Sequence, residues 1–245
     1  MTSDNTYNYR AYSWDLEEEE LARWLAEGPR AGEIAPDFEL TDLDGTTVRL
    51  AELRGRPVVI EFGSYSCPIF SDRVPAMERL AREHSAVSFL VIAIREAHPG
   101  ELLPQHRTTA EKRSAARKLA IEEGIGRRLL VDDLEGTVHR AYGGAWNPVY
   151  VLDAKGKVAF RRAWNHPGEV ATALAALEDS SSAPTSESVE MPPLSGRQAI
   201  GLRLLERGGR EALLDFYRGA PPPVRRRLEE SPSVAVRAAV KEETR

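Results

Sequence analysis

Short apolar runs alternate with longer amphipathic segments along residues 32–178. The apolar runs have the length of strands, and the amphipathic segments repeat their apolar positions every three to four residues, as helices do. The expected strands are 35–40, 48–50, 57–62, 88–94, 128–131, 148–153 and 157–162, and the expected helices are 68–84, 109–123, 133–142 and 167–177. Strands that alternate with helices, closed by a hairpin, predict an α/β domain in which helices cover both faces of one sheet.

The segments on either side of this domain have a different pattern. Residues 1–31 form a polar, acidic lead-in with one short amphipathic helix, which we expect to be capped by Asp15 and to end at Gly28-Pro29. Residues 179–194 are rich in Ser and Pro, which is typical of a linker. The chain is therefore expected to hold a lead-in, a domain, a linker and a C-terminal tail.

The tail, residues 195–245, returns to helical spacing. Helices are expected at 195–218 and 224–241, on either side of Pro221-Pro222-Pro223. A segment of this length buries little core by itself. We therefore expect the tail to dock on the main domain or on a partner.

Composition and charge narrow the possible partners and location. The 245 residues carry a net charge of −5, so we expect no nucleic-acid partner. No apolar stretch approaches the length that crosses a bilayer, and the polar N-terminus does not resemble a signal peptide. The single cysteine excludes an internal disulfide, and no spacing of Cys, His and carboxylates resembles a zinc site. We expect a cytoplasmic protein with no bound metal or cofactor and no membrane contact.

The one cysteine, Cys67, lies on the turn between the apolar strand 57–62 and the amphipathic helix 68–84. The N-terminus of a helix offers free N–H groups and a partial positive charge. Both favour a thiolate over a thiol, and the thiolate is the reactive form. The position predicts a nucleophile, whereas a lone cysteine elsewhere is more often a buried, inert side chain.

Other polar residues are expected near this turn. Ser64 and Ser66 flank Cys67 and either donate hydrogen bonds to the sulfur or to a substrate, or bind the local backbone as turn residues do. Glu96 and His98 follow the strand 88–94, whose C-terminal end lies on the same sheet edge as the Cys67 turn. A histidine there can act as a proton donor or relay, and Glu96 can orient its imidazole. The long loop 95–108 is expected to fold over the turn.

Three blocks of residues resemble the iodothyronine deiodinase family, which has a thioredoxin fold. They are Phe62-Gly63-Ser64-Tyr65-Ser66-Cys67-Pro68-Ile69-Phe70, Ile94-Arg95-Glu96-Ala97-His98-Pro99, and Leu103-Pro104-Gln105-His106-Arg107 followed by Arg113-Ser114-Ala115-Ala116-Arg117. Ala141-Tyr142-Gly143-Gly144-Ala145 is a weaker fourth match, and together the blocks cover roughly 35–178. The peroxiredoxin pattern is matched less well, because Ile60 stands where its proline is usually found.

The resemblance implies a thioredoxin-like fold and a site around the position of the family's selenocysteine, which Cys67 occupies. It implies catalytic roles for Cys67, Glu96, His98 and His106, with His106 in substrate handling and proton delivery. The residues expected to bind substrate are Ser64, Tyr65, Ser66, Phe70, Arg107, Trp146 and Pro148. Trp146 either lines an aromatic cleft or fills the core.

The departures from the family are also informative. Phe70 stands where a thioredoxin C-x-x-C motif has its second cysteine, and Arg127 and Arg128 stand where some family members carry a further cysteine. The arginine that faces iodothyronine in the family is absent before strand 148–153, where Asn147-Pro148 instead resembles the cis-proline bond of bacterial thioredoxin-like proteins. An oxidised Cys67 must therefore be reduced by an external thiol.

The sequence thus predicts a thiol-dependent redox enzyme of the deiodinase type. Cys67 would remove halogen from an aromatic substrate and be regenerated by glutathione, thioredoxin or, in vitro, dithiothreitol. One alternative is a one-cysteine peroxidase or disulfide reductase, and another is a non-catalytic redox sensor or binding module. The family also implies a possible homodimer.

Overall fold

The computed structural model describes residues 7–178 and 200–243. Within these residues a seven-stranded sheet has the order β2-β1-β5-β4-β3-β6-β7. Three central strands run parallel, namely β3 (Val58–Gly63), β4 (Ser88–Ala93) and β5 (Arg128–Val131), and the other neighbours pair antiparallel. The outer strands are β1 (Glu39–Asp42), β2 (Thr47–Arg49), β6 (Val149–Leu152) and β7 (Val158–Arg162), and a short 3-10 turn, η1 (Leu50–Leu53), follows β2. The predicted single sheet is confirmed, and it is mixed.

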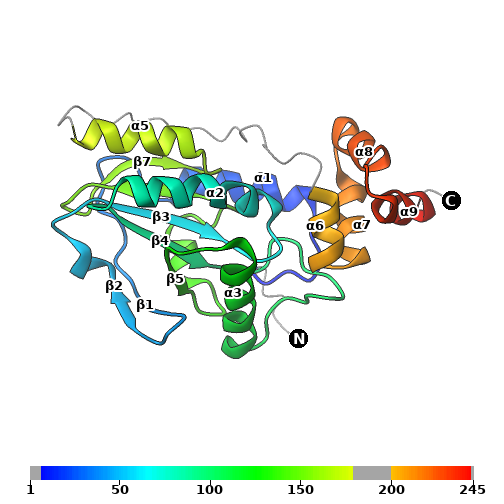
Figure 1. The fold of residues 1–245 in the computed structure, drawn as a ribbon, viewed down its shortest axis with the longest axis horizontal. Coiled ribbons are helices and arrows are strands. Elements are labelled where there is room, and N and C mark those ends of the chain that lie inside the picture. Colours follow the sequence, from blue (N-terminus) through cyan, green and yellow to red (C-terminus); the bar gives the residue numbers. More distant parts are fainter. Residues whose placement is uncertain (1–6, 179–199, 244–245) are drawn as a thin grey trace.

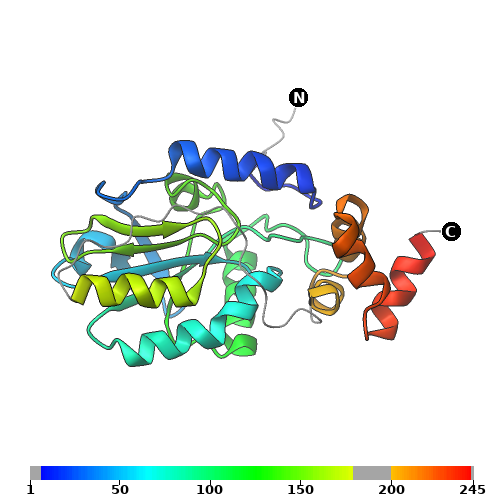
Figure 2. The same cartoon turned by 90° about the horizontal axis from the view of Figure 1, so that it is seen from above.

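Helices form a layer on each side of this sheet (Figure 1). Three helices cover one face, namely α2 (Pro68–Glu83), α3 (Thr109–Glu123) and α5 (Pro167–Glu178). The lead-in helix α1 (Trp14–Glu27) lies across the opposite face, as Figure 2 shows. The short helix α4 (Thr137–Ala141) connects β5 to β6.

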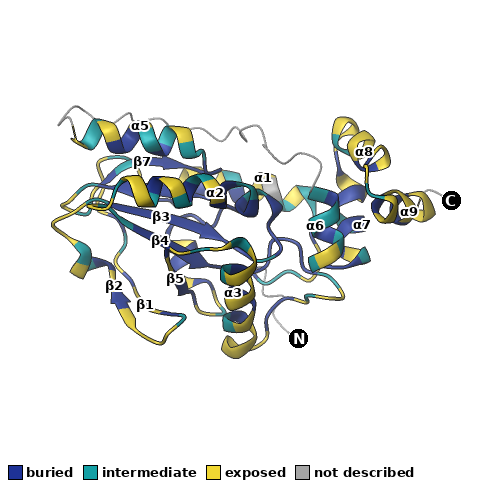
Figure 3. Cartoon of the chain, in the orientation of Figure 1, coloured by how far each residue is buried: buried dark blue, intermediate teal, exposed yellow. Residues whose placement is uncertain are grey.

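The core lies between these layers, and the central strands carry almost no exposed residue (Figure 3). Strands buried on both faces are largely apolar, as β3 and β4 are here, and Glu61 is the charged exception on β3. Trp24 of α1 is fully buried against Tyr150, and the guanidinium of Arg161 lies 4.2 Å from the centroid of the Trp24 ring. The lead-in is therefore part of the domain core.

Some element boundaries differ from the predictions for local reasons. Ser13, not Asp15, caps α1, because its hydroxyl accepts from the Asp15 N–H. The expected helix 133–142 is reduced to α4, since the Asp133 carboxylate closes a turn by accepting from the Thr137 N–H. The expected strand 35–40 begins at Glu39.

Four helices form the C-terminal module, which we define as residues 200–243. They are α6 (Ile200–Arg207), α7 (Arg210–Gly219), α8 (Pro222–Glu229) and α9 (Val234–Glu243). The expected helix 195–218 is interrupted at Gly209, whose φ of 95° lies where only glycine is comfortable, and the expected helix 224–241 is interrupted before Val234. The linker 179–194 and residues 195–199 lie outside the described residues.

The C-terminal module lies at one end of the sheet, next to the start of α2 (Figure 1). No helix in the described part of the chain is long and apolar enough to cross a bilayer.

Candidate active site

Cys67 caps the N-terminus of α2, at the point where the chain leaves β3. Its sulfur accepts a hydrogen bond from the Phe70 N–H at 3.4 Å. Pro68 occupies the first helical turn, where its missing N–H costs nothing. A Cβ on Gly63 would lie 2.1 Å from the Phe70 ring, so glycine is needed for that ring to pack against the end of β3. The predicted turn between strand and helix is confirmed.

The ionisation of Cys67 differs from the expectation. The side chain is 2% exposed, and burial raises the pKa of the thiol to about 11. The backbone N–H groups of Phe70 and Ile69 lower this pKa, as a helix N-terminus should, but they do not offset the burial, and the charges of Glu96 and Glu61 raise it further. The helix N-terminus favours the thiolate as predicted, but burial outweighs it, so the expected readily ionised Cys67 is not found in the resting protein.

Glu96 joins the Cys67 turn to the loop 95–108. One carboxylate oxygen accepts from the N–H and the hydroxyl of Ser66 at 2.7 and 2.6 Å, and the other lies 3.0 Å from Nε2 of His106. All three residues are buried. Burial by itself would raise the pKa of Glu96, but the bonds from His106 and Ser66 lower it overall. The expectation that Glu96 orients His98 is wrong, because both carboxylate oxygens are bound elsewhere.

The two serines bind loop backbone and make no hydrogen bond to the sulfur. Ser64 Oγ accepts from the Ala97 N–H at 3.1 Å, and Ser66 Oγ accepts from the His98 N–H at 3.0 Å. These bonds hold the loop against the turn. Of the two alternatives that the sequence left open, the structure supports the backbone-binding one.

His98 lies among aromatic rings. Its imidazole stacks on Trp146 with centroids 6.2 Å apart, lies 4.5 Å from the Tyr12 ring and meets the Phe216 ring edge-on at 5.4 Å. Burial lowers the pKa of His98 to about 3, and its Nδ1 has no hydrogen-bond partner among the described residues. The side chain is therefore neutral at physiological pH, and an imidazolium acid at this position is not available.

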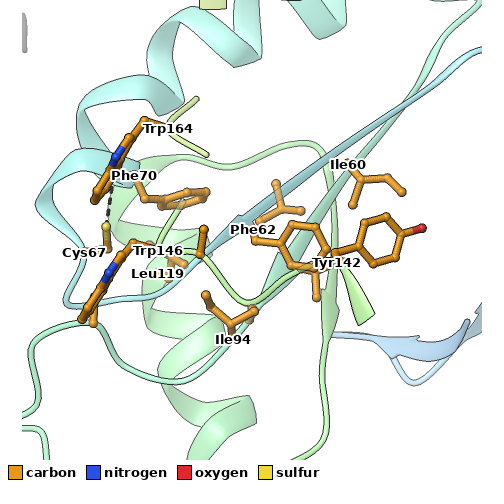
Figure 4. Close-up of a cluster of buried hydrophobic side chains, with 14 of the residues drawn as sticks. Ile60, Phe62, Cys67, Phe70, Ile94, Leu119, Tyr142, Trp146 and Trp164 are labelled. Atoms are coloured by element: carbon orange, nitrogen blue, oxygen red, sulfur yellow. Dashed lines mark hydrogen bonds between the residues drawn. The ribbon is translucent and has the colours of Figure 1, made fainter. Parts of the chain in front are cut away.

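Cys67 and His98 open into one pocket of about 310 Å³. Three predicted site residues line it, namely Cys67, His98 and Trp146, and Figure 4 shows Cys67 between the rings of Trp146 and Trp164. The remaining lining residues are Tyr12, Trp14, Pro68, Ile69, Trp164, Ile200, Gly201, Phe216, Val224, Arg227, Leu228, Glu230, Ser231 and Pro232. The lead-in and the C-terminal module thus complete the pocket, and no motif in the sequence marked their contribution.

The other predicted substrate residues do not line this pocket. Phe70 is fully buried in the core, and Pro148 is buried at the start of β6. Tyr65 donates to the Glu122 carboxylate at 2.9 Å, and Arg107 lies with His106 at a separate hollow. Their predicted contact with a substrate in this pocket is not supported by their positions.

The peptide bond before Pro148 is trans, as are all the described peptide bonds, so Asn147-Pro148 does not share the cis bond of the thioredoxin-like proteins that it resembles. Asn147 is held on both sides, because its Nδ2 donates to the Phe62 carbonyl at 2.7 Å and its carbonyl accepts from the Asn165 N–H at 2.9 Å. This bonding extends the sheet across the position.

Arg127 has a structural role that the sequence did not reveal. Its guanidinium donates to Glu61 at 2.5 Å and to Glu78 at 2.8 Å, and Asn165 donates to the other oxygen of Glu61 at 2.5 Å. Glu61 lies on β3 and is fully buried. A buried carboxylate requires such partners. Arg127, just before β5, therefore compensates the charge of Glu61 from two strands away, across β4.

The fold and the site together define a thioredoxin-like protein with a single cysteine at the active-site turn. A family model described as iodothyronine deiodinase matches residues 21–175, and the chain belongs to that family. The match begins inside α1 and ends before the C-terminal module.

Curated relatives agree with this assignment. The chain is 34% identical over 137 residues to thyroxine 5-deiodinase from Rattus norvegicus, covering 50% of this chain and 44% of the relative. It is 36% identical over 110 residues to thyroxine 5-deiodinase from Homo sapiens, covering 40% of this chain and 36% of the relative. The chain thus spans about half, or less, of the length of the curated relatives it matches.

Solved structures share the fold. An uncharacterized conserved protein from Geobacillus kaustophilus superposes with a TM-score of 0.54 at 24% identity, covering 64% of this chain and 87% of that protein. A hypothetical protein from Sinorhizobium meliloti superposes with a TM-score of 0.53 at 17% identity, covering 64% of this chain and 88% of that protein. At these identities the likeness concerns the fold alone.

Proposed function

We propose that the protein removes halogen reductively from an aromatic substrate, with Cys67 as the nucleophile. The observation that carries this proposal is the pocket, which Cys67 lines together with the rings of Tyr12, Trp14, Trp146, Trp164 and Phe216. Aromatic rings attract one another in offset and edge-on arrangements, so these walls favour an aromatic ring as the bound group. Membership of the deiodinase family supports the same reaction.

In the proposed first step, the sulfur of Cys67 attacks the halogen. A sulfur–halogen bond forms, the carbon–halogen bond breaks, and its electron pair remains on the ring carbon, which takes a proton. Neutral His98 receives the thiol proton and delivers one to the carbon. Because the pKa of Cys67 is about 11 and that of His98 about 3, the transfer must be concerted, so that neither a free thiolate nor an imidazolium accumulates.

The second step regenerates the cysteine and needs two thiols from outside. The first displaces halide from the sulfur and forms a mixed disulfide with Cys67, and the second releases the Cys67 thiol and a small disulfide. The chain contains one cysteine, and Phe70 stands where a resolving thiol would be. The net reaction consumes one aryl halide and two thiols, and yields the dehalogenated ring, hydrogen halide and a disulfide.

The test is halide release from iodotyrosine or a halogenated phenol in the presence of excess dithiothreitol. We expect Cys67→Ser to abolish release and His98→Asn to lower it by about 100-fold or more, the usual range for proton transfer by a side chain. His84→Asn is the matched control, since His84 contacts Glu178 away from the pocket. Halide release that survives Cys67→Ser would refute the mechanism.

The same preparation distinguishes the alternatives. Peroxide consumption without halide release would replace dehalogenation by a one-cysteine peroxidase. Turnover of neither substrate would favour a redox sensor or binding module.

A further inference from the structure

The C-terminal module forms the outer wall of the Cys67 pocket, although it lies outside the region that matches the family. Helix α6 contributes Ile200 and Gly201, and Leu228 and Pro232 come from α8 and the turn after it. Cys67 is 2% exposed behind this wall. Access to the sulfur is therefore decided by how firmly the module is attached.

One attachment is a buried cluster of charges around Arg207. Its guanidinium donates to the Tyr65 carbonyl at 2.6 Å and to the Ser71 hydroxyl at 2.9 Å, which ties α6 to both sides of the Cys67 turn. It also pairs with Glu123 at the end of α3, and Arg203 pairs with the same carboxylate. The Arg207 and Glu123 side chains are 9% and 8% exposed, and removing one partner of a buried ion pair is strongly destabilising.

A second attachment joins the module to the loop 95–108. The Glu101 carboxylate accepts from the Glu211 N–H at 2.9 Å and from the Arg210 N–H, so it caps the start of α7. The Leu102 N–H donates to the Gly208 carbonyl at 3.1 Å. A Cβ on Gly208 would lie 2.9 Å from the His98 carbonyl, so the two backbones are in close contact.

We propose that the docked module restricts the reductant of Cys67 to small-molecule thiols and excludes thiol proteins. A cavity of about 310 Å³ admits a small thiol. A protein thiol must bring its own Cβ to about 4 Å from that of Cys67 to form a mixed disulfide, and the module occupies the space that its backbone would need. This assignment rests on the proposed function for the need to reduce Cys67.

The test uses thiol exchange and does not require dehalogenation. The folded protein is labelled with 5,5′-dithiobis(2-nitrobenzoate), which leaves a mixed disulfide of thionitrobenzoate on Cys67, the chain's single thiol. Glutathione or a reduced thioredoxin-type protein is then added at equal thiol concentration, and thionitrobenzoate release is followed by absorbance. A short cysteine peptide carrying the same label gives the reference rates.

The rate of each thiol with the folded protein is divided by its rate with the labelled peptide. We expect this ratio to be at least about 100-fold smaller for thioredoxin than for glutathione. Arg207→Ala and Glu123→Gln weaken the attachment from its two sides and should raise the thioredoxin rate by about 10-fold or more, with a much smaller change for glutathione. Arg218→Ala is the matched control, because the ion pairs of Arg218 with described residues, namely Asp215, Glu211 and Glu243, all lie within the module, and the change should affect neither rate.

Three results would overturn the proposal. The first is a wild-type protein from which thioredoxin and glutathione release the label equally well, once each rate is divided by the rate with the peptide. The second is failure of the reagent to label Cys67 in the folded protein, which would close the pocket to small thiols as well. The third is an unchanged thioredoxin rate in Arg207→Ala and Glu123→Gln when hydrogen exchange shows that these substitutions have loosened the module. Failure of halide release would instead refute the proposed function and leave these exchange rates unaffected.

Discussion

The pH dependence of Cys67 alkylation tests the central feature of the site, which is a nucleophile held as a neutral thiol by burial. Burial raises the pKa of Cys67 to about 11. At pH 7 a thiol with that pKa is ionised in roughly one molecule in 10⁴, compared with a few per cent for a free cysteine of pKa about 8.5. The thiolate fraction is therefore lower by about 100-fold or more.

The assay is alkylation by iodoacetamide between pH 6 and 10, followed by mass spectrometry. Because the chain has one cysteine, the signal has one source. We expect the logarithm of the rate to rise by one for each pH unit up to at least pH 10, since only the thiolate reacts. Poor access through the pocket lowers every rate by the same factor and leaves the slope unchanged.

The urea-unfolded protein is the control, and its profile should level off near pH 8.5. A folded-state profile that levels off at or below about pH 8.5 would mean that the helix N-terminus outweighs burial, and would refute the reasoning.

The raised pKa of Cys67 also makes the stability of the folded protein depend on pH. Because the folded pKa lies above the unfolded value, stabilisation is complete below the unfolded pKa and is lost as pH rises toward 11, by about 3 kcal/mol relative to Cys67→Ala.

Three further predictions concern the surroundings of the sulfur. Burial lowers the pKa of His98 to about 3, so as the pH drops below 6.5 the unfolded chain binds a proton that the folded one does not, and this contributes a loss of about 1.4 kcal/mol of stability per pH unit. Burial also lowers the pKa of His139, so the slope seen in urea unfolding of His98→Asn should be smaller by about that amount and should not vanish. Glu96→Gln removes the charge that binds Ser66 and His106 and should cost about 2–3 kcal/mol of unfolding free energy, while an unchanged urea midpoint would contradict the network. Gly63→Ala should cost about 1–3 kcal/mol in thermal unfolding because its methyl group meets the Phe70 ring, whereas Gly126→Ala, with an ordinary contact at 3.4 Å, should be nearly neutral.

The fold of the domain was largely predictable because its elements carry local signals. The apolar runs of β3 and β4 and the helical spacing of α2 and α3 are recorded in consecutive residues, so periodicity alone placed these elements. The interruption of the tail at Gly209 was missed, because a glycine within a helical pattern ends a helix only where the backbone turns.

The candidate site was only partly predictable. The blocks around Cys67, Glu96 and His106 were recognisable as sequence, and the structure brings the three residues to one edge of the sheet. The hydrogen bond between Glu96 and His106 was not predictable, because hydrogen-bond partners depend on the path of the loop 95–108. The ionisation of Cys67 was misjudged for a related reason: a helix N-terminus is a local feature, whereas burial depends on every element packed over the sulfur.

The sequence by itself determined the order of strands and helices, the position of the one thiol on the turn between them, and the absence of a second thiol to resolve it. Only the tertiary structure decided what surrounds that thiol. Tyr12 and Trp14 come from the lead-in and Phe216 from the C-terminal module, far from Cys67 in sequence. Their contacts arise from packing across the end of the sheet, which no local spacing encodes. These contacts place the helix N-terminus in a pocket with aromatic walls, around a neutral cysteine.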